Sequence, residues 1–167
     1  MKYIKIIASF LFVTFLNQAN GQSTEPTTEH KKLSALVGRW TIQGMEGRYL
    51  EICDMYTGGY FLVCNSEIKT ESGGLNKGVS IMGYSTEAKH ITYYHYGSTG
   101  ASRTLRGRID EDGSLYFEGE ETIKGKLTKT RIAMKRVGEN YDFKEETSTD
   151  GAPWTISTSI VYVRAKQ

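Results

Sequence analysis

The sequence has little excess charge, few cysteines and no recognisable catalytic motif. Its 167 residues include 21 basic and 19 acidic side chains, so there is no basic field to hold nucleic acid or an anionic membrane surface. No G-x-S-x-G element marks a serine hydrolase. Residues 119–127 resemble a phosphate-binding loop but have one residue too many between their glycines and no Ser or Thr after Lys126. Any function must therefore be inferred from the architecture.

Long apolar runs are absent after residue 16. The run at residues 6–16 follows a short basic start and is too short to span a bilayer, which takes about 20 helical residues. Ala19 and Gly21 then place small residues before a cleavage point at Gln22. We predict a secretory signal peptide over residues 1–21, with an uncleaved membrane anchor as the alternative. The expected product is exported, periplasmic or secreted, without stable membrane insertion.

The chain that remains after cleavage, 167 − 21 = 146 residues, suits one domain. Residues 22–29 are polar, contain proline and show no periodicity, so we expect a flexible tether. Residues 30–37 carry apolar side chains at helical spacing and precede Gly38, which predicts a short helix. The folded domain is expected to cover residues 30–167.

From residue 39 onward apolar and polar residues alternate, which is typical of strands. Short turn sequences separate the candidate strands at the spacing of an antiparallel sandwich or barrel. The predicted strands are residues 39–43, 48–55, 60–70, 77–84, 90–96, 102–109, 114–121, 127–137, 140–147 and 154–164. We predict an all-β, antiparallel up-and-down β-barrel of about ten strands. A barrel of this size can keep a cavity for one small ligand.

The two cysteines flank a hairpin turn. Gly58 and Gly59 are both able to adopt positive φ, which a two-residue hairpin turn requires. Counting outward from this turn, Met55 faces Leu62 and Cys53 faces Cys64. Opposed residues lie close enough for a disulfide, which an exported chain can form. The alternative is a pair of reduced, half-buried thiols.

Four stretches together resemble one family. Residues 30–44 resemble the start of the bacterial domain-of-unknown-function family 1579, a lipocalin-like group. Residues 57–62 resemble its glycine turn, and residues 161–164 its last strand. Residues 78–85 resemble its G-x-G-x-x-G-Y-D strand end, with Ser80 in place of a common glycine and Ser85 in place of a common aspartate. The resemblance spans about residues 30–164 and implies a lipocalin-like barrel with no settled activity.

The resemblance also implies roles for three residues. In calycin-type barrels a G-x-W sequence on the first strand closes one end, and an arginine from the last strand lies across the indole. Here the matching residues are Gly38, Trp40 and Arg164. We expect a structural role for all three; the alternative for Trp40 is direct contact with a ligand.

The most unusual strand is residues 90–96. Period two places Ile91, Tyr93 and His95 on one face, and Tyr94 and Tyr96 on the other. A phenol and an imidazole beside apolar surface suit an amphipathic ligand, so Tyr93, His95 and Tyr96 are candidate ligand-binding residues. The alternative is a solvated His95 near the rim.

The next strand supplies two further candidates, Arg103 and Arg106. An arginine inside a barrel can clamp a carboxylate with its guanidinium fork. The alternative is a solvated outer face, because a buried arginine needs a partner. We expect solvated faces for the acidic residues at 118–121 and 144–146.

The leading hypothesis is an exported barrel that binds a small hydrophobic or amphipathic molecule, with no catalytic residue and no metal. Some related barrels bind haem through a histidine on a late strand, but here no histidine follows His95, so a haem cofactor is disfavoured. Two alternatives stay open. One is an enzyme with His95 as general acid or base in the same cavity. The other is an envelope interaction protein with a filled core.

Overall fold

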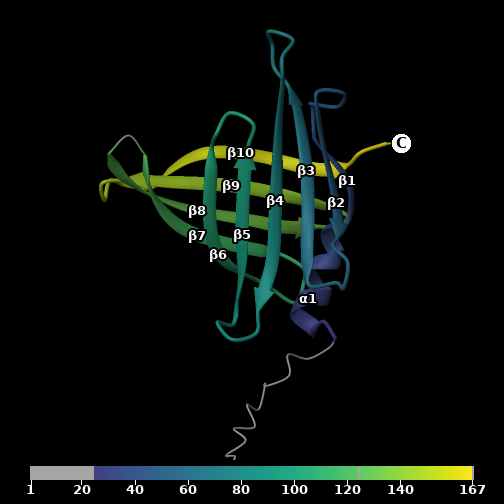
Figure 1. Cartoon of the computed structure of the whole chain (residues 1–167). Helices are drawn as coiled ribbons and strands as arrows, with labels where there is room; N and C mark the ends of the chain where they lie inside the picture. The colour runs from purple at the N-terminus through teal and green to yellow at the C-terminus, as the bar shows by residue number, and fades with distance from the viewer. Residues whose placement is uncertain (1–24, 124, 167) are drawn as a thin grey trace, which may run out of the picture.

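The computed structural model describes residues 25–123 and 125–166 and shows one closed barrel of ten antiparallel strands. Each strand pairs with the next along the chain, and β10 pairs with β1 to close the sheet. Strands β2 to β5 cross in front of β7 to β10, so the barrel is flattened into two layers (Figure 1). The predicted all-β up-and-down barrel is confirmed. The predicted signal peptide lies outside the described residues.

All ten predicted strands are present, each with boundaries within two residues of the prediction. The strands are β1 (Gly38–Ile42), β2 (Tyr49–Met55), β3 (Phe61–Lys69), β4 (Leu75–Ser85), β5 (His90–Gly97), β6 (Ser102–Ile109), β7 (Leu115–Ile123), β8 (Lys126–Val137), β9 (Asn140–Thr149) and β10 (Thr155–Arg164). Alternate side chains point into the barrel. Among the inward ones, Leu62, Ile91 and Leu115 are almost completely buried.

Two short helices cover one end of the barrel (Figure 1). Helix α1 (Thr28–Lys32) continues into the 3-10 helix η1 (Leu33–Leu36), which contacts β2 and β3. The helix begins two residues before the predicted start because Thr27 and His30 form a capping box, in which the backbone N–H of Thr27 donates to Nδ1 of His30 at 3.1 Å. No helix among the described residues has the length and apolar character needed to cross a membrane.

The β2–β3 hairpin has the predicted register and carries a disulfide. Cys53 is paired with Cys64 across the two strands, and their sulfur atoms are bonded. Gly58 and Gly59 both have positive φ, of 92° and 74°, as the tight turn requires. The disulfide, predicted from counting outward from this turn, is confirmed. It lies on the inner face of the barrel, where both cysteines are buried.

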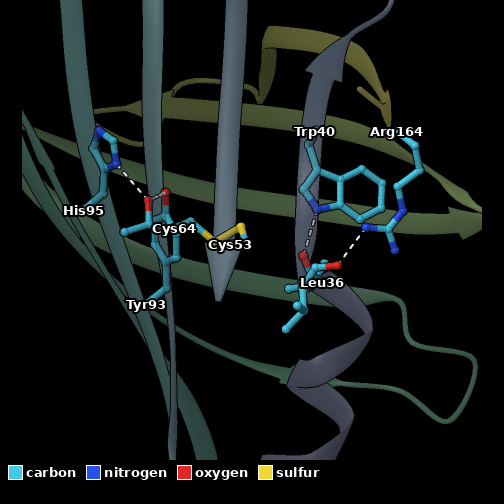
Figure 2. The surroundings of a disulfide bond; sticks show 9 residues. Leu36, Trp40, Cys53, Cys64, Tyr93, His95 and Arg164 are labelled. Atoms are coloured by element: carbon cyan, nitrogen blue, oxygen red, sulfur yellow. Dashed lines mark hydrogen bonds between the residues drawn. A yellow bond between two sulfur atoms is a disulfide. The ribbon is translucent and has the colours of Figure 1, made fainter. Parts of the chain in front are cut away.

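Trp40 closes the barrel just above the helices. Its indole N–H donates a hydrogen bond of 2.7 Å to the carbonyl of Leu36 (Figure 2). The Arg164 guanidinium lies 3.8 Å from the ring centroid and donates to the Val37 carbonyl. Gly38 has a φ of +128°, and a Cβ there would collide with that guanidinium. Glycine is therefore needed both for the backbone conformation and for the close approach.

Candidate functional site

The barrel interior holds a cavity of about 220 Å³ on the side of Trp40 away from the helices. Side chains from eight strands line it: Glu51, Ser80, Met82, Tyr93, His95, Arg103, Phe117, Ile132, Met134, Phe143, Glu145 and Tyr162. A second hollow, of about 20 Å³, lies against Trp40 and the disulfide. Glu51, Met82, Met134 and Tyr162 line both spaces. The cavity therefore reaches down toward the closed end.

One wall of the cavity is a hydrogen-bonded group of three polar side chains. The Ser80 hydroxyl lies 3.0 Å from Nδ1 of His95 and 3.2 Å from the hydroxyl of Tyr93. The rings of Tyr93 and His95 are stacked, with centroids 6.3 Å apart. Burial, and then the nearby Arg103 charge, lower the pKa of His95. A neutral imidazole at pH 7 can accept or donate a hydrogen bond to a ligand.

An ion pair crosses the cavity beside this group. Nη1 of Arg103 lies 2.7 Å from a carboxylate oxygen of Glu145, and the two side chains are 30% and 13% exposed. The Ser157 hydroxyl donates to the other Glu145 oxygen, at 3.1 Å. The expectation of a solvated face is wrong for Glu145, because its side chain shares the inner face of β9 with Phe143. Arg103 thus has a partner within the protein.

A second acidic side chain of the cavity is Glu51, on the inner face of β2. It lies two residues before Cys53, and its carboxylate oxygen is within 4.8 Å of the disulfide sulfurs. Burial raises the pKa of Glu51 to about 7, although a hydrogen bond from Tyr49 acts in the opposite direction. Tyr49 also hydrogen-bonds to Tyr162, and burial raises the pKa of both phenols. These tyrosines therefore remain neutral at physiological pH.

The predicted ligand-binding residues divide between the two faces of the barrel. Tyr93, His95 and Arg103 line the cavity together. Tyr96 is 51% exposed and lies on the outer face of β5, one residue from His95. Arg106 also lies outside, where it faces Glu118 of β7 and lines an external groove. Because neighbouring strand positions point to opposite faces, the structure does not bring Tyr96 and Arg106 to the cavity.

The sequence analysis predicts only Tyr93, His95 and Arg103 of the cavity lining; the polar residues that it misses include Glu51, Ser80 and Glu145. In the sequence Ser80 stands out only because it occupies the position of a common family glycine, yet its hydroxyl connects Tyr93 and His95. Glu51 could have been found, because the hairpin count that places Cys53 inside also places residue 51 inside. The partner of Arg103 carried no local signal, since Glu145 is 42 residues away.

Neither a metal nor haem fits the described interior well. The only grouping of possible metal ligands in the described part of the chain is Glu51, Cys53 and Cys64, and its two sulfurs are joined in the disulfide. Drug-sized ligands commonly occupy pockets of about 300–1,000 Å³. A porphyrin is larger than most drug-sized ligands and needs a correspondingly large pocket. A cavity of about 220 Å³ suits a much smaller molecule.

Comparison with known proteins adds a family but no activity. A sequence model of the family described as "Protein of unknown function (DUF1579)" matches residues 25–164, in agreement with the resemblance inferred from four short stretches. No curated protein matches the chain.

Proposed function

The chain belongs to the DUF1579 family of proteins of unknown function, and from that premise we propose that it binds one small amphipathic molecule inside its barrel. The observation that carries this proposal is the interior cavity of about 220 Å³, which has chemically distinct walls. Ser80, Tyr93 and His95 offer hydrogen bonds on one side. Met82, Met134 and other apolar side chains line the rest. Such a combination fixes the orientation of a ligand that has a polar and an apolar part.

The size of the cavity limits the ligand. Its volume lies below the usual range for drug-sized molecules, about 300–1,000 Å³, so long-chain lipids are poor candidates. The same hollow argues against an interaction protein with a filled core. We therefore expect a compact molecule that buries most of its surface between the two layers of the barrel.

Filling the cavity is expected to abolish binding. Met134 lines the cavity, and Met134→Trp adds bulk where the ligand would lie. Protein isolated from its own host should carry a bound small molecule in native mass spectrometry, and the variant should lose at least about 90% of that occupancy. The matched control is Ala133→Trp, because Ala133 lies on the outer face of the same strand and lines external grooves.

The control should keep wild-type occupancy. Circular dichroism should show the same strand content in both variants, and Met134→Phe provides a smaller change if the tryptophan does not fit. Equal occupancy in both variants, or a wild-type protein that carries no bound molecule, would contradict the proposal.

An enzymatic function has one observation in its favour. The hydroxyl of Ser80 lies 3.0 Å from His95 inside the cavity, which is the distance needed for a nucleophile and its base. However, Nδ1 is the nitrogen that faces Ser80, and in the described residues no acidic side chain is hydrogen-bonded to the imidazole. A fluorophosphonate probe tests this candidate: labelling of Ser80 that disappears in His95→Gln would support acyl-transfer chemistry over simple binding.

Export is part of the proposal. A disulfide inside the barrel is expected of a protein that folds in an oxidising compartment, and residues 1–21 have the pattern of a signal peptide. We infer that the protein acts in the periplasm or outside the cell. Mass spectrometry of protein from the native host should give a mature N-terminus at Gln22; an intact Met1 would contradict it.

A further inference from the structure

Among the side chains that face the cavity, the negative charges outnumber the positive ones. Glu51 and Glu145 line it, and Glu121 lies on the same inner face of β7 as Phe117, close enough to interact with Arg103. Arg103 is the one basic side chain in the lining apart from His95. Since Arg103 is paired with Glu145 at 2.7 Å, the interior carries an excess of negative charge whenever Glu51 is ionised.

Glu51 is the acid that lacks a cation. Its hydrogen-bond partner is the neutral hydroxyl of Tyr49, and no basic side chain in the described residues forms an ion pair with it. A buried carboxylate without a counter-ion is costly. It would be stabilised strongly by a cation that enters the same cavity from outside.

The walls around Glu51 are suited to an organic cation. Four aromatic rings line the cavity in two contacting pairs: Tyr93 with Phe117 at 5.5 Å, and Phe143 with Tyr162 at 5.8 Å between centroids. Aromatic faces attract ammonium groups, particularly where water is excluded. Met82 and Met134 add apolar, adaptable surface for the rest of the molecule.

We propose that the ligand is a small organic cation, an ammonium compound with a compact apolar body, whose charge pairs with Glu51 between these aromatic rings. The inference rests on the proposed function, since it assumes that the cavity is the binding site. The hydrogen-bonded group of Ser80, Tyr93 and His95 then holds any second polar group of the ligand.

This pairing makes binding depend on pH. The cation requires ionised Glu51, whose pKa is about 7, so affinity should fall by about 10-fold for each pH unit well below 7. Of the other groups facing Glu51, Tyr49, Tyr93 and Tyr162 stay neutral because burial raises each pKa. Arg103 is paired with Glu145 and also interacts with Glu121. Protonation of His95 would act in the same direction, so His95→Gln separates its contribution.

Three probes of similar size, each a benzene ring with one polar group, test the charge. Benzylamine is cationic at pH 8, benzyl alcohol is neutral and benzoate is anionic. In titration calorimetry on the full mature protein, freed of any endogenous ligand by unfolding and refolding, benzylamine should bind at least about 10-fold more tightly than benzyl alcohol, and benzoate more weakly than both. Glu51→Gln should remove the preference for the amine while keeping the binding of the alcohol. Glu118→Gln, on the outer face of the barrel, should change neither.

The outcomes separate the two proposals. If benzyl alcohol or benzoate binds the wild type as tightly as benzylamine, the cavity is a binding site but the ligand is not a cation. If none of the three binds, both proposals fail. If Glu51→Gln does not fold, the pH dependence of benzylamine binding in the wild type and in His95→Gln decides: affinity that is equal at pH 8 and pH 5.5 overturns the role of Glu51.

Discussion

Replacing Trp40 with alanine is expected to lower the free energy of unfolding by about 3–5 kcal/mol, the range for removing a large buried aromatic side chain. The indole is only 3% exposed. It packs against Tyr141 at 5.5 Å between centroids and hydrogen-bonds to Leu36. Its loss would leave a hollow beneath the disulfide and a guanidinium without its aromatic partner. Urea denaturation followed by circular dichroism measures the change.

The chain offers a matched control in its second tryptophan. Trp154 is 39% exposed and also lies against an arginine, with the Arg131 guanidinium 4.4 Å from the ring centroid. Trp154→Ala removes the same side chain and the same kind of cation–π contact, yet should cost clearly less than Trp40→Ala because much more of the Trp154 side chain already lies in water. Similar losses for the two variants would show that Trp40 does not close the barrel as described.

The fold was accessible from the sequence because its determinants are local. Alternation marks each strand, and turn residues mark each joint, so all ten strands appear within two residues of the predicted limits. The disulfide followed from one more local rule, the pairing of residues at equal distances from the turn at Gly58 and Gly59. The start of the helix was less well predicted, because the cap at Thr27 lies in a stretch whose polar composition suggested a tether.

The site was only partly accessible, because it depends on which face of each strand is inside and on contacts between distant strands. Tyr93 and Tyr96 look alike in the sequence, yet one lies in the cavity and the other on the outer surface. The ion pair of Arg103 with Glu145 joins β6 to β9 across the interior, and no local pattern indicates it. In the sequence Glu51 is an acid between two apolar neighbours, which indicates nothing by itself. Only the register of β2 places its side chain on the inner face of the barrel.

Glu51→Gln is expected to stabilise the ligand-free protein at pH 8 by up to about 3 kcal/mol and to have little effect at pH 4.5. In the folded state burial raises the pKa of Glu51 to about 7, from the 4.5 that is usual for a glutamate in water. The folded protein therefore holds a proton on Glu51 that the unfolded chain releases between these pH values. Stability falls as pH rises through this window and then levels off, by about 1.4 kcal/mol per unit of pKa difference. Glutamine cannot ionise and avoids this loss.

Chemical denaturation at pH 4.5, 6 and 8 measures the free energy of unfolding of the wild type and of Glu51→Gln. The titration of all other groups affects both proteins alike and largely cancels in the difference between them. Glu118→Gln, on the outer face, should show no such trend. A stability difference that does not grow with pH would mean that Glu51 is not the buried acid described.

If the stability difference does grow with pH, saturating benzylamine at pH 8 should stabilise the wild type more than the variant, because the cation then offsets the cost of the charge. A residue that destabilises the empty barrel and is relieved by a cation serves binding rather than folding.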